Sequence, residues 1–400
     1  MIGIDSALKL ILENSSVLEE TENLSIDEAT GNILRENVFA DRDLPPFNRS
    51  MMDGYAFHSN YLDVTEKCKV VGEIFPGEAP SAQFILKQNE VIRIFTGAAV
   101  PHFCDTVIQH EWFLKVNDTI FLQEGKVVKK GANIHNQGSD AKKGEVLIKE
   151  GTLITARHLP TLLSTGHNEV RVALKPKISI VTTGNEVVKP FEQPGPTQIR
   201  DANLVTLNEM AKPWAESIEL IGPISDDPQK LKEALKRALN SNIVIVSAGV
   251  SAGDHDFVPD VLADLGVEKV FHKIDLKPGH PLWFGRKGQT LVFGLPGNPV
   301  SGQVCFKLMI EPLLKKILGM TNYNHQLLTL PLIESFNKKH HRHEWAMGVL
   351  EHTSEGTKIL PLKNTGSGDF FHYGKAMGLI SLPGKEKIFV PGERVDWLPL

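Results

Sequence analysis

The chain has 400 residues, of which 41% are hydrophobic and 23% are charged, a balance typical of a globular protein and contrary to extensive disorder. Its net charge of -5 gives no general basic excess, so neither a nucleic acid nor a membrane is expected as partner. The three cysteines form no CxxC pair, which excludes a disulfide scaffold and a zinc finger and favours a reducing, cytoplasmic setting. No transmembrane helix and no signal peptide are expected.

The N-terminal region, residues 1–172, predicts helical segments around a β-rich insert at about 41–150. Apolar side chains at helical spacing predict an amphipathic helix over 4–20. Two adjacent prolines then exclude a regular helix, and short β-type runs alternate with Gly and Pro turns through the insert. A further helix is expected at 155–166.

The middle region, residues 176–320, alternates strands with helices and predicts a mostly parallel sheet covered on both faces, a three-layer α/β domain. Strands are expected at KISIVTTG, 217–221, 242–249, VEKVFHKI and QTLVFGLPG, with helices near 201–211, 228–240, 257–265 and 300–318. Residues 326–400 contain only short strands divided by Gly and Pro, and predict a small C-terminal β-barrel-like domain. The predicted fold class is therefore multi-domain α/β.

Ligands of open parallel sheets bind beyond the carboxyl ends of the strands, so the loops there are the candidate site. In TTGNEV, Thr183 and Gly184 could contact a ligand and Glu186 a metal; an ordinary glycine turn is about equally consistent. In SAGVSAGDHD, the small residues favour an anion cradle, and carboxylates beside it suit Mg²⁺. The alternative for that loop is a simple helix cap. Its candidate residues are Ser247, Gly249, Ser251, Gly253 and Asp256.

Two further loops follow later strands. In FHKIDLKPGHP, Lys273 and Lys277 are expected on one face of a strand, as an oxyanion site or as a solvated edge. GLPGNPVSG predicts a rigid turn at a helix start, and a stiff connection is the alternative. The candidate residues of this turn are Pro296, Gly297, Asn298 and Pro299.

Several common motifs are absent from the sequence. It contains no GxxxxGK[ST], no GxGxxG opening a helix after a strand and no GxSxG, so a P-loop NTPase, a dinucleotide-binding domain and an α/β-hydrolase are disfavoured. KKHHRHEW fits a basic surface turn better than a metal site. The residues alone thus indicate an enzyme that holds a phosphate-bearing ligand with Mg²⁺ in a cleft at the sheet's end.

Six strings occur in one order: PPFNRSMMDGYAF, IRIFTGAAVP, TTGNEV, SAGVSAGDHDFV, LKPGHPLWFG and GLPGNPVS. With them, nearly the whole chain resembles the molybdopterin molybdenumtransferases, the MoeA and gephyrin E-domain family. The resemblance implies an enzyme that binds adenylylated molybdopterin and molybdate, cleaves the adenylate with Mg²⁺ and releases AMP and molybdenum cofactor. It also implies an elongated homodimer whose active site is shared between subunits. A molybdopterin adenylyltransferase and molybdoenzyme acceptors are the implied partners.

The resemblance assigns roles to individual residues. Asp53, Thr96, Glu186, Asp256, Lys273 and Lys277 match positions needed for activity. Metal ligation is implied for Glu186, Asp226 and Asp256, and Asp227 adjoins Asp226. Asp140, Arg342 and Ser367 join the glycine, serine and proline residues of the loops as cofactor-binding positions, the last two only by a loose match.

The sequence departs from the family pattern at four places. His280 stands where lysine is frequent, Met347 where arginine is frequent and Ala248 where glycine is frequent, and NIHNQGSD lacks the usual arginines. These changes remove positive charge and bear on anion affinity, and on molybdate against tungstate, more than on the class of reaction.

Two other functions are compatible with parts of the sequence. A nucleotide or pyridine-nucleotide hydrolase could use the same α/β domain, but it has no need of the SMMDGYA region. A non-catalytic pterin-binding scaffold is disfavoured by the intact Asp53, Glu186 and Asp256.

Overall fold

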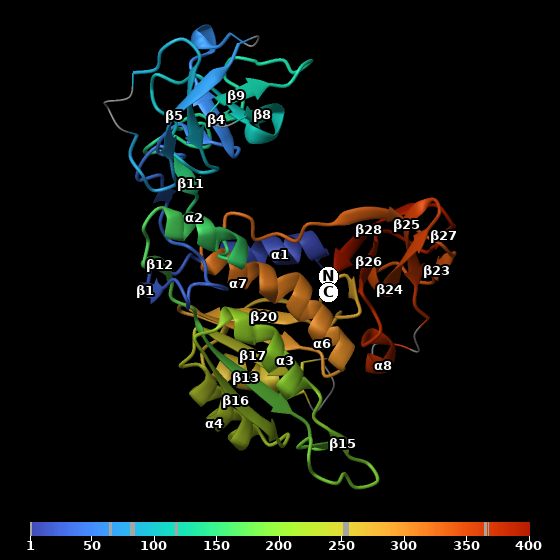
Figure 1. The fold of residues 1–400 in the computed structure, drawn as a ribbon. Coiled ribbons are helices and arrows are strands. Elements are labelled where there is room, and N and C mark those ends of the chain that lie inside the picture. Colours follow the sequence, from blue (N-terminus) through green and yellow to red (C-terminus); the bar gives the residue numbers. More distant parts are fainter. Residues whose placement is uncertain are drawn as a thin grey trace.

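The computed structural model places the chain in three connected parts, with both termini near the centre of the molecule (Figure 1). The candidate residues Ser251, Gly253 and Ser367 lie outside the described residues. The structure describes residues 2–63, 66–80, 85–116, 119–250, 256–363, 366 and 368–400.

The first helix is shorter than the sequence pattern predicts. Helix α1 covers Ile4–Glu13 rather than 4–20. Asn14 Nδ2 donates to the carbonyl of Leu10 at 2.9 Å, and Ser15 Oγ donates to that of Leu12 at 2.8 Å. These side chains satisfy the last carbonyls of the helix and end it, since Asn and Ser compete with the backbone for its hydrogen bonds.

The β-rich insert forms the part drawn at the top of Figure 1. Its six-stranded sheet has the order β7-β4-β6-β5-β9-β8 and buries a core of its own. Two short strand pairs, β2 with β11 and β3 with β10, lie at its base, and β1 pairs with β12 below. Their bounds are β1 Thr21–Ser25, β2 Val38–Phe39, β3 Arg49–Ser50, β4 Gly54–Phe57, β5 Cys68–Ile74, β6 Glu90–Ile94, β7 Thr106–Gln109, β8 Phe113–Val116, β9 Thr119–Leu122, β10 Ile134–His135, β11 Val146–Ile148 and β12 Glu169–Ala173. Helix α2, Leu159–Ser164, confirms the end of the predicted 155–166 helix.

The middle part is the predicted three-layer α/β domain. Its sheet runs β16-β13-β17-β21-β20-β18, and the first four strands are parallel. Helices α3, α6 and α7 pack on one face and α4 and α5 on the other. The bounds are β13 Lys177–Thr183, α3 Asn203–Ala211, β16 Ser217–Ile224, α4 Pro228–Ala238, β17 Ile243–Ser247, α5 Val258–Asp264, β18 Glu268–His272, β20 Trp283–Lys287, β21 Thr290–Leu295, α6 Pro299–Cys305 and α7 Glu311–Ile317. Neighbouring residues such as Ile245 and Val246 enter opposite core clusters, as the two-residue period of a strand requires.

One strand of this domain departs from the prediction. β18 ends at His272, and Lys273 has a φ of 68° that breaks the strand. Lys277 lies instead on β19, Leu276–Lys277, which pairs with β24 of the C-terminal part. The two lysines therefore do not share one strand face. The sequence pattern could not show this, because the pairing partner of β19 lies more than sixty residues further along the chain.

The C-terminal part is all-β apart from the short α8, Phe370–Tyr373. Its sheet has the order β19-β24-β26-β28-β22, with β25 also paired to β24. Within the residues described, an isolated β-bridge between Leu332 and Ile359 links the segment after β22 to β25. Closure of the sheet into a barrel stays a prediction. The bounds are β22 Leu328–Pro331, β23 Phe336–Lys338, β24 His343–Thr353, β25 Gly356–Pro361, β26 Gly378–Leu382, β27 Lys387–Phe389 and β28 Arg394–Pro399. No helix in the described parts of the chain is long and apolar enough to cross a membrane.

Candidate functional site

A central cleft of about 1020 Å³ opens at the carboxyl ends of β13, β17 and β21. The loops after these three strands line it, as expected for an open parallel sheet. Residues of the C-terminal part close one side. The predicted site residues that line this cleft are Thr183, Gly184, Glu186, Asp226, Ser247, Gly249, Asp256, Pro296, Gly297, Asn298 and Pro299.

A second pocket of about 520 Å³ adjoins the central cleft, since Pro281, Pro296 and Asn298 line both. It lies between the α/β domain and the C-terminal part, and it contains Lys277 and Arg342. These side chains supply positive charge, which suits an oxyanion. The structure therefore brings Lys277 and Arg342 beside the predicted loops, although they lie far apart in the sequence.

Part of the central cleft is acidic. Glu186 and Asp226 also line a third cavity, of about 790 Å³, which adjoins the central cleft. Carboxylates gather where these two cavities meet, although Arg200 also lines the central cleft. The second pocket holds the cations Lys277 and Arg342 together with the carboxylate of Glu344.

The carboxylates supply the hard oxygen donors that Mg²⁺ prefers. In the described ranges, no three His, Cys, Asp or Glu residues converge closely enough to hold a metal by themselves. Asp226 is held by Asn185, whose backbone N–H donates to Asp226 Oδ2 at 3.2 Å and whose Oδ1 accepts from the Asp226 N–H at 3.0 Å.

A buried network behind the cleft joins its loops, and sequence reasoning missed it. Asp201 is 6% exposed and accepts from Thr182 Oγ1 at 2.6 Å and from the backbone N–H of Asn203 at 2.9 Å. The amide of Asn203 donates to Ser247 Oγ at 2.9 Å and to the carbonyl of Gly297 at 2.7 Å. An Asp shortly before a helix resembles an ordinary cap, so its second role had no sequence signal.

Thr183 offers an unused hydrogen-bonding group at the cleft. Its Oγ1 is buried and has no hydrogen-bond partner among the described residues. A buried hydroxyl without a partner is costly, so a ligand oxygen in the cleft would stabilise it. This supports the predicted binding role of Thr183.

Ala248 has a φ of 81°, a left-handed conformation that costs a residue with a Cβ of the order of 1 kcal/mol or more. We expect Ala248→Gly to raise the free energy of unfolding by about 1 kcal/mol, because glycine adopts this φ without strain. Urea denaturation measures the change. Ala248→Ser keeps the Cβ and should give no gain; an equal gain from both variants would contradict the explanation.

Glu344 fixes the lysine of the second pocket. Its side chain is only 10% exposed, and its Oε1 lies 3.1 Å from Lys277 Nζ. His340 Nε2 lies 2.9 Å from Oε2, and burial lowers the pKa of His340. The ion pair with Glu344 holds Lys277 at the pocket.

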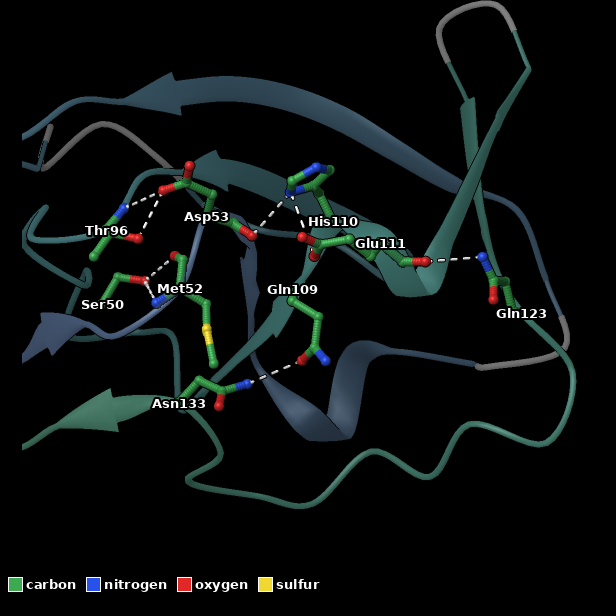
Figure 2. A network of polar contacts seen from close by, with 9 residues as sticks. All are labelled: Ser50, Met52, Asp53, Thr96, Gln109, His110, Glu111, Gln123 and Asn133. Atoms are coloured by element: carbon green, nitrogen blue, oxygen red, sulfur yellow. Dashed lines mark hydrogen bonds and ion pairs between the residues drawn. The ribbon is translucent and has the colours of Figure 1, made fainter.

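Asp53 and Thr96 form a separate pair in the N-terminal insert (Figure 2). The backbone N–H and the hydroxyl of Thr96 both donate to Asp53 Oδ1, each at 2.7 Å. These two hydrogen bonds, the backbone one foremost, hold the pKa of the Asp53 carboxyl below its usual range. On the other side of Asp53, the backbone N–H of His110 donates to the Asp53 carbonyl at 3.0 Å. The carboxylate is thus exposed, oriented and ionised.

Removing the Thr96 hydroxyl should change the pH dependence of any activity that needs Asp53 as a carboxylate. Thr96→Val deletes one donor to the charged form, so the pKa of Asp53 rises. Activity is lost as pH falls through that pKa, and the acid limb of the rate profile therefore moves to higher pH. Thr96→Ser keeps the donor and should leave the limb in place. A pH profile measured on both variants tests this, and a downward shift for Thr96→Val would contradict it.

Not all predicted residues meet at the cleft. Asp53, Thr96 and Asp140 belong to the N-terminal region and line none of the three cavities as far as the structure describes them. Asp140 Oδ1 lies within hydrogen-bonding distance of His135 Nε2, at 2.7 Å. In Figure 1, the insert that contains β4 lies at the opposite end of the molecule from β15, Ile199–Arg200. Both residues of β15 line the central cleft. Lys273 is likewise not among the described lining residues.

Comparison with family models gives consecutive matches along the chain. Residues 2–166 match the MoeA N-terminal region (domain I and II), 179–316 a probable molybdopterin binding domain, and 329–400 the MoeA C-terminal region (domain IV). The matched regions cover all three parts of the fold.

Curated relatives and solved structures agree with these matches. A molybdopterin molybdenumtransferase of Haemophilus influenzae is 32% identical over 324 residues, 81% of this chain and 79% of that protein. One from Staphylococcus epidermidis is 28% identical over 399 residues, 99% of this chain and 94% of that protein. The crystal structure of a molybdopterin biosynthesis MoeA protein from Pyrococcus horikoshii covers 100% of both chains with a TM-score of 0.83 and 27% identity.

Proposed function

Because the chain belongs to the molybdopterin molybdenumtransferase family, enzymes of molybdenum cofactor biosynthesis, we propose that it inserts molybdate into adenylylated molybdopterin and releases AMP. The carboxylates of the central cleft and the cations Lys277 and Arg342 of the adjoining second pocket carry this proposal. Both substrates are anions, so each needs either a cation between it and the carboxylates or a cationic side chain. Together the cleft and the second pocket supply both.

The residues of the central cleft bind and orient the adenylylated substrate. Thr183 and Ser247 offer hydroxyl groups, and Gly184 and Gly249 let the backbone approach the phosphates closely. Gly184 and Gly249 have φ values of 137° and 71°, which an L side chain adopts only with strain. The rigid turn from Pro296 to Pro299 shapes the wall opposite. We also assign cofactor-binding roles to Ser251, Gly253 and Ser367.

Glu186, Asp226 and Asp256 would hold Mg²⁺. When bound, the cation supplies charge neutralisation at the pyrophosphate that is to be cleaved. The residues of this chain keep those carboxylates in place: Asn185 orients Asp226, and the Asp201 network fixes the loop that carries Glu186 relative to its neighbours. Molybdate, as substrate, meets Lys277 and Arg342 in the second pocket, with Lys273 assigned near it.

We further propose that the protein acts as a homodimer in the cytoplasm, with molybdopterin adenylyltransferase and molybdoenzyme acceptors as partners. Asp53 and Thr96 form an oriented, exposed pair that lines no described cavity of its own chain. A second subunit that presents this pair, with Asp140, to the cleft would give it a function. Such exchange requires an interface with two-fold symmetry, in which each subunit completes the other's site.

The direct test uses purified protein, adenylylated molybdopterin, molybdate and Mg²⁺, and follows AMP release together with reconstitution of a molybdoenzyme. We expect AMP release that depends on both molybdate and Mg²⁺. AMP release that does not depend on molybdate would favour a nucleotide hydrolase. Binding of adenylylated molybdopterin without AMP release would favour a pterin-binding scaffold.

Lysine at position 280 should increase the affinity for molybdate. His280 lines the second pocket, and its Nδ1 lies 2.8 Å from the carbonyl of Ile274. His280→Lys adds a permanent positive charge to a pocket that binds a dianion, so the molybdate concentration for half-maximal insertion should fall severalfold. His280→Gln serves as the neutral control. An unchanged or higher value for the lysine variant would contradict the assignment of molybdate to this pocket.

A further inference from the structure

One aromatic side chain, Phe370 of the C-terminal part, lines the central cleft among the described residues that surround it. The other lining side chains are hydroxyl, carboxylate, amide, proline and aliphatic groups, with the guanidinium of Arg200. Phe370 is 43% exposed. A large ring left partly in water beside an otherwise polar cleft is a natural contact surface for another flat ring.

The fold holds this ring firmly in position. Asp369 precedes α8, accepts from the backbone N–H of His372 at 3.2 Å and lies 2.7 Å from His372 Nδ1. Tyr373 packs against the main hydrophobic core, and α8 lies beside α6 (Figure 1). The ring centroids of Phe370 and Phe371 lie 4.5 Å apart, and Phe371 is largely exposed. A preorganised ring gives a stacking partner at little entropic cost.

The segment that carries the ring passes near the junction of the two ligand compartments. Gly368 lines the central cleft with Phe370, and a Cβ placed on Gly368 would lie 3.8 Å from Asn298 Oδ1. Asn298 lines both the central cleft and the second pocket. A flat ring above this junction would extend from the phosphate cradle toward Lys277 and Arg342.

We propose that Phe370 stacks on a heteroaromatic ring of the bound substrate and so determines specificity for it. Adenine and pterin are the two rings that the substrate of the proposed function carries, and both offer the same stacking face. The proposal rests on the proposed function for the identity of the ligand. Stacking of a base on an aromatic side chain is sensitive to loss of the ring and tolerant of which ring replaces it.

The test measures binding to the full-length protein by titration calorimetry with three probes: AMP, 6-hydroxymethylpterin and ribose 5-phosphate. Phe370→Leu should weaken at least one of the two ring-bearing probes by about tenfold and leave ribose 5-phosphate unchanged. Phe370→Trp should restore the affinity. Phe371→Leu is the matched control, because Phe371 is on the same helix, is 74% exposed and does not line the cleft.

The outcome also identifies the ring. A loss confined to AMP assigns the adenine, and a loss confined to the pterin assigns the pterin. Equal loss for ribose 5-phosphate, no loss for either ring, an equal effect of Phe371→Leu, or no binding of either ring probe to the wild-type protein would overturn the proposal. Ring binding that depends on Phe370, found together with no molybdate-dependent AMP release, would contradict the proposed function and still support the stacking contact.

Discussion

Glu186→Gln is expected to lower Mg²⁺-dependent AMP release on the order of a hundredfold while the fold stays intact. Glu186 lies where the central cleft meets the acidic cavity, so its carboxylate is placed to hold the cation beside the phosphates. Loss of one hard oxygen donor with its charge weakens both metal binding and charge neutralisation, which together amount to several kcal/mol. The measurement is the rate of AMP release as a function of Mg²⁺ concentration, with the half-maximal Mg²⁺ concentration as second readout.

The matched control for this variant is Glu192→Gln. Glu192 is exposed in the loop between β14, Val187–Val188, and β15, a few residues after Glu186, but does not line the cleft. Glu192→Gln removes the same negative charge from the same region of the surface. A similar loss in both variants would show a general electrostatic effect, and an unchanged Mg²⁺ requirement in Glu186→Gln would remove Glu186 from the metal site.

A purified heterodimer of one Asp53→Asn chain and one Asp256→Asn chain is expected to have about half of the wild-type activity, although each parent homodimer is inactive. If the active site combines Asp53 of one subunit with Asp256 of the other, one site of the heterodimer carries both replacements and the other carries none. Two differently tagged chains, purified sequentially on both tags, give this species for the assay of AMP release.

A second heterodimer distinguishes an active site shared between subunits from an active site within one chain. Glu186 and Asp256 line the same cleft, so pairing a Glu186→Gln chain with an Asp256→Asn chain leaves one replacement in each site and no recovery is expected. If each active site instead lies within one chain, the Asp53→Asn and Asp256→Asn heterodimer will also show no activity. A monomer in light-scattering measurements would likewise contradict the shared site.

The central cleft and the second pocket imply different responses of the enzyme. Variants of the cleft carboxylates should change the Mg²⁺ requirement, and variants of Lys277 or Arg342 should change the molybdate requirement. Glu344 pairs with Lys277 and lines the second pocket beside it, so a variant at Glu344 also changes the charge of that pocket. The cations of the second pocket also explain why a net charge of -5 does not exclude an anionic substrate.

The sequence by itself determined the α/β domain and its site loops. Strands such as Ile243–Ser247 are continuous apolar runs because both faces are buried, and loops rich in Gly follow them at the carboxyl end. These are local patterns, and the parallel topology brings their ends together without further information. The placement of Thr183, Glu186, Ser247 and Asp256 on one cleft followed from that alone.

Tertiary structure decided what depends on distant segments. Lys277 gained its partner Glu344 through the pairing of β19 with β24, Asp201 connects three loops through Asn203, and Phe370 enters the cleft from another part of the chain. The sequence pattern of each of these residues is that of an ordinary strand end, helix cap or surface aromatic. Their roles arise from contacts between residues far apart in the sequence, and local periodicity gives no information about such contacts.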